Sequence, residues 1–125
     1  MTSLVEFIEA RLAEDEQIAR AAAARASDWH SSKGYVGGGG EFTDLGDPDE
    51  EPYWHGDEVI VYDEGWPLAV EATHIARHDP ARVLREVESK RRIVEWASTF
   101  GYTKLLEELA LPYRDHPDYD PTWSE

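Results

Sequence analysis

The pattern of charged, glycine and apolar residues changes twice along the chain, and this change constrains its fold more than any other feature. Residues 34–76 contain no Lys or Arg, yet they carry eleven Asp or Glu residues and a run of four glycines at 37–40. The segments before and after this stretch place apolar residues at helical spacing. Because glycine runs and acidic loops interrupt helices, the sequence predicts an α+β protein with helices at both ends and a β-rich middle.

The N-terminal segment is predicted to form a helix over residues 3–25. Leu4, Ile8 and Leu12 lie on one face at helical spacing, which is typical of a helix that packs against a core. Ser3 and Glu6 have the spacing of a capping box, in which the serine side chain accepts a hydrogen bond from the glutamate amide. The helix should therefore begin at Ser3.

The middle segment, residues 27–70, is predicted to be an acidic antiparallel β-meander. Strong β-formers and turn residues alternate along it, and the glycine run at 37–40 is expected to form a loop between strands. Residues 57–62 and 66–70 are expected to pair as a hairpin, with Pro67 placing the second strand at an edge. The predicted strands are Trp29–Val36, Glu41–Leu45, Asp57–Tyr62 and Trp66–Val70, and Gly46–Pro52 is predicted to be an acidic loop.

The C-terminal part is predicted to contain a short helix at 71–78, a longer helix from Pro80 to about Ser98, and a third helix at 102–110. Asp79 is a favourable N-cap and Pro80 a favourable first helical residue, while Gly101 is a typical helix stop. Tyr113, Tyr119 and Trp123 are expected to pin the tail to the body. The whole chain is predicted to be a single domain with parts 1–26, 27–70, 71–111 and 112–125.

The composition excludes several kinds of function. The chain has no cysteine, which excludes disulfides, thiolate metal sites and cysteine nucleophiles. Its 27 acids and 12 bases give a net charge of −15, which disfavours nonspecific binding to nucleic acids and anionic membranes. With neither a membrane-spanning apolar run nor a signal peptide in the sequence, a cytoplasmic protein is expected.

One helical stripe in the third predicted segment is a candidate ligand-binding site. Its arginines can bind phosphate bidentately and its tryptophan can stack on a base, and Trp54 or Trp66 would complete a pocket for a nucleotide or another small anion. The alternative is a helix with internal ion pairs such as Arg92–Glu88. The stripe consists of Arg82, Arg85, Ser89, Arg92 and Trp96.

A second candidate site lies on the short helix. Glu71, His74 and His78 fall on one helical face, and carboxylate and imidazole groups are ligands for Zn²⁺ or another divalent metal. The alternative is that the histidines pack against the sheet or interact with the helix C-terminus. No phosphate loop, catalytic triad or other catalytic motif is present, so no catalytic residue is predicted and no cofactor is expected apart from this metal.

Three segments resemble the DUF6221 family of actinobacterial and actinophage proteins. They are DEQIAR at 15–20, HIARHDPARVLREVESKRRI at 74–93 and LALPYRDHPDY at 109–119. The order of elements is also similar to that of phage Ead/Ea22-like accessory proteins. The resemblance implies a phage or prophage setting, and it implies no established activity.

These observations favour a non-enzymatic binding protein that associates with a host protein or with itself as a homo-oligomer. Three alternatives stay open: a protein that sequesters a nucleotide signal on the arginine stripe, an acidic mimic of nucleic acid, and a metal-dependent hydrolase at the Glu71 site. An acidic mimic would act through the acids between 41 and 71, and its binding would weaken steeply with salt.

Overall fold

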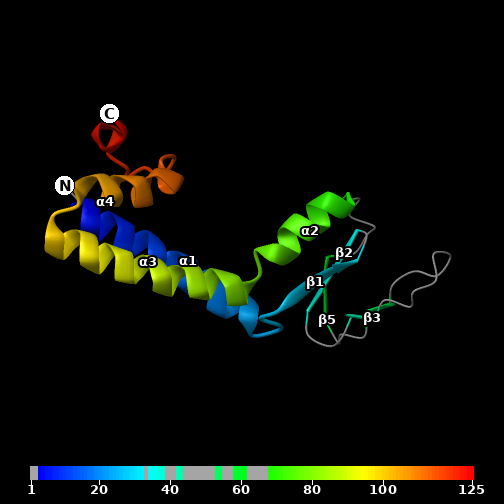
Figure 1. The fold of residues 1–125 in the computed structure, drawn as a ribbon. Helices are drawn as coiled ribbons and strands as arrows, with labels where there is room; N and C mark the ends of the chain where they lie inside the picture. The colour runs from blue at the N-terminus through cyan, green and yellow to red at the C-terminus, as the bar shows by residue number, and fades with distance from the viewer. Residues whose placement is uncertain (1–2, 33, 39–41, 44–52, 55–57, 62–67) are drawn as a thin grey trace. The chain divides into compact units, whose positions relative to one another are not determined.

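The computed structural model describes residues 3–32, 34–38, 42–43, 53–54, 58–61 and 68–125, and it confirms an α+β arrangement (Figure 1). The described residues divide into two compact units, one within 1–18 and 84–125 and one within 19–83. The helices are α1 (Leu4–Ala23), α2 (Ala69–Arg77), α3 (Pro80–Phe100) and α4 (Thr103–Ala110). The strands are β1 (Trp29–Ser32), β2 (Tyr35–Gly38), β3 (Phe42–Thr43), β4 (Tyr53–Trp54) and β5 (Glu58–Val61), and two 3₁₀ turns are η2 (Leu111–Tyr113) and η3 (Pro121–Ser124).

In the first unit, α1 and α3 lie side by side (Figure 1). Helix α4 follows α3 and lies beside the same end of the pair. Of the apolar positions predicted from helical spacing, Ile8 and Leu12 are buried in its core and Leu4 is partly buried. An ion pair between Arg91 and Glu16 links the two long helices. The buried side chains are Phe7, Ile8 and Leu12 of α1, Val87, Val94 and Ala97 of α3, and Leu106 and Ala110 of α4. Hydrophobic burial along these stripes is therefore what holds the unit together.

The predicted helix boundaries at Ser3, Asp79 and Gly101 are confirmed. Ser3 Oγ accepts a hydrogen bond from the Glu6 amide at 3.2 Å, and Asp79 Oδ1 accepts one from the Arg82 amide at 2.9 Å. Gly101 has a φ of 72°, a left-handed conformation that glycine adopts without steric cost. Short-range capping chemistry thus fixes where α1 and α3 begin and where α3 ends.

The second unit contains an antiparallel sheet of order β1-β2-β5, and β3 pairs with β4 in a separate two-stranded ladder. Helix α2 packs on the larger sheet by burying Ala72 and Ala76 against Val36. Asp79 has a second role here, since its Oδ2 accepts a hydrogen bond from the Trp29 amide at 3.0 Å. One carboxylate therefore joins the start of β1 to the start of α3.

Two predictions for residues 29–38 are wrong, and Gly39 and Gly40 lie outside the described residues. Residues 29–36 do not form one strand, because β1 and β2 pair as a hairpin in which Ser32 lies opposite Tyr35. Gly37 and Gly38 belong to β2 and are buried rather than lying in a loop. The reason is spatial: a Cβ placed on Gly38 would lie 2.3 Å from the Cβ of Ala26, so the strand needs glycine there to pass close to the chain.

The predicted strand at 66–70 is also corrected. Ala69 and Val70 form the first turn of α2, which begins earlier than the predicted residue 71. Glu71 explains the change, since its Oε1 accepts a hydrogen bond from the Leu68 amide at 2.7 Å and so stabilises the helix start. Strand β5 pairs with β2; Pro67 and the predicted loop at 46–52 lie outside the described residues.

Candidate interaction surface

The side of α3 that faces away from the core carries most of the predicted arginine stripe. Arg85, Ser89, Arg92 and Trp96 are all exposed, whereas Val87 and Val94 on the opposite side are buried. Arg92 forms an ion pair with Glu88, one turn earlier, as the alternative interpretation of the stripe predicted. An exposed pair of this kind stabilises a helix by about 0.2–0.5 kcal/mol.

The remaining residues of the predicted nucleotide pocket are placed as follows. Arg82 lies in the second unit, where its Nη1 donates a hydrogen bond to the Arg77 carbonyl oxygen at 3.2 Å. Trp66 and the side chain of Trp54 lie outside the described residues. A nucleotide site on Arg82, Arg85, Arg92 and Trp96 therefore stays a prediction.

Four large apolar side chains gather where α3 ends and α4 begins, and we call them the aromatic corner. Trp96 is 62% exposed, Phe100 67%, Tyr102 58% and Leu105 41%. Trp96 and Phe100 are one turn apart on α3, and the Phe100 and Tyr102 ring centroids lie 6.1 Å apart. Exposed apolar side chains that cluster in this way are typical of protein-binding surfaces.

The turn at Gly101 creates the aromatic corner. The Tyr102 amide donates to the Ala97 carbonyl oxygen at 2.8 Å, and the Leu105 amide donates to the Tyr102 carbonyl oxygen at 3.1 Å. These bonds fold the chain back after Phe100, so that Tyr102 lies beside it. Sequence analysis identified Trp96 but missed Phe100 and Tyr102, although aromatic residues on both sides of a helix-stopping glycine were the available signal.

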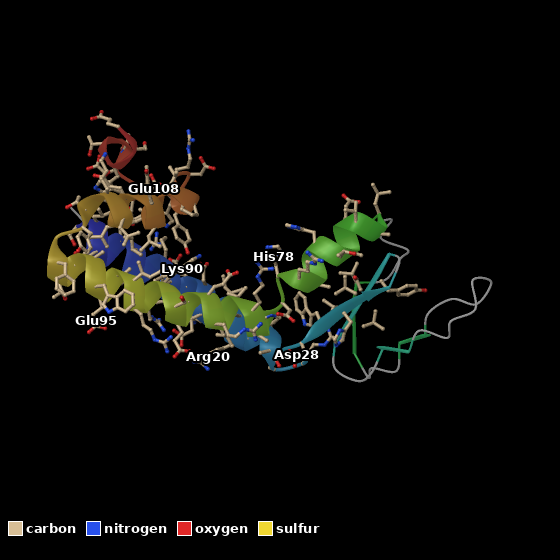
Figure 2. The ribbon with its side chains drawn as sticks, viewed as in Figure 1. Arg20, Asp28, His78, Lys90, Glu95 and Glu108 are labelled. Carbon is tan, nitrogen blue, oxygen red and sulfur yellow. The ribbon has the colours of Figure 1, made fainter. Side chains whose placement is uncertain are left out.

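The predicted metal site does not form as a group of three ligands. Among the described residues no set of three or more His, Asp or Glu side chains is placed to hold a metal ion. The Glu71 carboxylate is used at the start of α2, and His78 Nδ1 donates to the His74 carbonyl oxygen at 2.8 Å. The two imidazole rings remain close, with centroids 4.4 Å apart, and both histidines are exposed. Figure 2 labels His78 near the end of α2.

The C-terminal tail is pinned to α1, as predicted. Phe7 is 1% exposed and its ring lies 6.4, 5.8 and 5.1 Å from the rings of Tyr113, Tyr119 and Trp123. The Arg11 guanidinium lies over the same Phe7 ring at 5.2 Å, an attractive cation–π arrangement. These contacts form a largely buried aromatic cluster, which we call the tail cluster, and they attach the tail to α1.

Polar contacts strengthen the tail cluster. The Tyr113 hydroxyl donates to Asp15 Oδ2 at 2.5 Å, and Arg11 contacts His116 as well as Glu14. Burial, and next the hydrogen bond to Asp15, raise the pKa of Tyr113 above its usual range. The tyrosine is thus held protonated, as a donor to a carboxylate.

A shallow pocket of about 390 Å³ lies next to the tail cluster, within the same unit. Its wall mixes both signs of charge with one indole, and Lys104 and Glu107 on it pair with each other at 3.3 Å. The lining residues are Lys104, Glu107, Glu108, Leu111, Arg114, Trp123, Ser124 and Glu125. Because the charges are mixed and partly paired, this pocket favours no single class of ligand.

Most of the acids predicted to mimic nucleic acid lie in residues outside the described part of the chain, so that hypothesis stays a prediction. Among the helices that the structure describes, none is long and apolar enough to cross a lipid bilayer.

The fold and these surfaces define the class of the molecule: a small acidic α+β protein with an exposed aromatic corner on a helical unit. Comparison with known proteins then identifies its family. The chain belongs to DUF6221, a family of unknown function, whose model matches residues 1–125. This confirms the resemblance drawn from the three sequence motifs; the similarity to Ead/Ea22-like proteins stays a prediction. No curated protein and no solved structure matches the chain.

Proposed function

We propose that this protein is a non-enzymatic binding protein that acts in the cytoplasm, in a phage or prophage setting, by docking onto another protein through its aromatic corner. The observation that carries the proposal is the exposure of Trp96, Phe100 and Tyr102 at one turn. Aromatic side chains supply large contact areas at low entropic cost and are frequent hot spots of protein interfaces. Burying these rings against a partner removes their apolar surface from water, which is favourable.

The charge of the chain supports a protein as the partner. A net charge of −15 repels phosphate backbones and anionic lipid surfaces, which are the other large partners that exposed aromatic residues serve. An apolar surface on another protein meets no such repulsion and covers the rings from water. The expected partner therefore presents aliphatic or aromatic side chains to the aromatic corner.

Site-specific photo-crosslinking in the native host cell tests this proposal. A photoreactive phenylalanine analogue at position 100 should give a discrete crosslinked product. Mass spectrometry then identifies the protein that is linked to this chain. The same analogue at Glu9, an exposed position on α1, is the matched control. Equal products at both positions, or none at position 100, would contradict the proposal.

Affinity measured with the identified protein then completes the test. With both proteins purified, Trp96→Ala should weaken binding at least tenfold, which is the effect expected of an interface hot spot. Glu9→Ala should leave the affinity unchanged. A partner that binds the Trp96→Ala protein as tightly as the native chain must dock elsewhere, and the assignment of the aromatic corner would then be wrong.

A further inference from the structure

The outer face of α3 carries a regular pattern of charge within the first unit. Four exposed residues, which we call the charge row, alternate in sign along it: Arg85, Glu88, Arg92 and Glu95. The two arginines are seven residues apart and so are the two glutamates, which keeps all four on one side of a helix. Glu88 and Arg92 pair with each other, whereas Arg85 and Glu95 have no ion-pair partner among the described residues.

We propose that two copies of this chain pair through the charge row, with their α3 helices antiparallel. The argument is the symmetry of the row about position 90. Arg85 and Glu95 are each five residues from that position, and Glu88 and Arg92 are each two residues from it. Reversing the second helix about position 90 therefore sets Arg85 opposite Glu95 and Glu88 opposite Arg92, in both copies at once.

The same row excludes a parallel pairing in register. There Arg85 would face Arg85 of the second copy and Glu88 would face Glu88, and like charges set opposite each other repel. A two-fold symmetric, antiparallel contact is thus the arrangement in which the surface is complementary to itself. It also gives Arg85 and Glu95 an ion-pair partner, which neither has among the residues that the structure describes.

One further residue fits this arrangement. Ser89, next to the centre of the row, is exposed and short, which lets the two helices approach. The pairing forms four ion pairs between the two copies.

The pairing would make the molecule bivalent. Phe100 lies ten residues beyond the centre on each copy, so the two aromatic corners would stand about 30 Å apart along the helices at 1.5 Å per residue. Two linked binding surfaces raise the apparent affinity for a repeated partner. This inference rests on the charge row and is independent of whether the aromatic corner binds another protein.

Sedimentation velocity on the full chain, from micromolar to millimolar concentration, tests the pairing. The native chain should shift from monomer to dimer as concentration rises, although its net charge keeps the association weak. Arg85→Glu and Glu95→Arg should each weaken the dimer at least tenfold, because each sets like charges opposite one another. The double variant Arg85→Glu/Glu95→Arg exchanges the charges and should restore the native affinity.

Matched controls separate this effect from a change of overall charge. Arg114→Glu and Glu9→Arg make the same changes at exposed positions outside the charge row, and they should leave the dimer unchanged. Thermal unfolding of each variant checks that α3 is intact. A native chain that stays monomeric throughout, a dimer insensitive to either single reversal, or a double variant that stays monomeric would overturn the proposal. Each of these results leaves the crosslinking test at position 100 valid, so the two proposals fail separately.

Discussion

Phe7 and Phe100 are the same residue type on two long helices, yet Phe7 is 1% exposed and Phe100 is 67% exposed. Phe7 is surrounded by rings of the C-terminal tail and by Arg11. Phe100 lies beside the Tyr102 ring and is mostly exposed. The contrast shows that the number of aromatic residues does not predict their role. The rings of the tail cluster are packed together and stabilise the fold, whereas the rings of the aromatic corner stay exposed and can contact a partner.

Of the substitutions that test this contrast, Phe7→Ala should lower the free energy of unfolding most. Removing a fully buried ring leaves a cavity that the neighbouring aromatic side chains cannot fill, and such substitutions cost about 3–5 kcal/mol of unfolding free energy. Urea denaturation measures the loss. If Phe7→Ala does not fold, Phe7→Leu should fold and still lose stability, while a change below about 0.5 kcal/mol for Phe7→Ala would show that the tail cluster does not hold the unit together.

Tyr113→Phe should lower the free energy of unfolding by an intermediate amount. It removes the hydrogen bond to Asp15, and a bond to a charged acceptor contributes about 1.5–3 kcal/mol. Burial and Asp15 raise the pKa of Tyr113 in the folded protein, so its protonated hydroxyl stabilises the native state at neutral pH. That stability should be lost as the pH rises above about 10, where unfolded tyrosine ionises.

Unfolding experiments between pH 8 and pH 11 check the direction of this effect. The native chain should lose stability more steeply with rising pH than Tyr113→Phe, which lacks the ionising group. Tyr102→Phe is the matched control, because Tyr102 is exposed and its loss should not change the slope. Equal slopes for native and Tyr113→Phe proteins would mean that the hydroxyl is not held by Asp15.

The sequence predicted the features of this fold that depend on neighbours in the chain. The ends of α1 and α3 follow from Ser3, Asp79 and Gly101, each of which acts within a few residues of its own position. The hairpin at 29–38 was missed because the need for glycine at position 38 comes from Ala26, which lies beside it only in the folded protein.

The candidate sites also contain features that spacing along the chain predicts and features that depend on how the chain folds. Helical spacing correctly put Trp96 and Arg92 on one face, and it also predicted the Arg92–Glu88 pair. It could not show that Phe100 stays exposed, because that depends on the turn at Gly101 and on which elements pack against the end of α3. Nor could spacing reveal that Glu71, on the same helical face as His74, is used at the start of α2.

Phe100→Ala should have the smallest effect on stability, and for that reason it is the sharpest test of the comparison. An exposed ring loses little on truncation, so the unfolding free energy should change by less than about 0.5 kcal/mol. Urea denaturation beside Phe7→Ala gives the measurement, with the same residue type and the same substitution in both proteins. A loss approaching that of Phe7→Ala would mean that Phe100 packs within the protein in solution, and the aromatic corner would then be core rather than a surface for a partner.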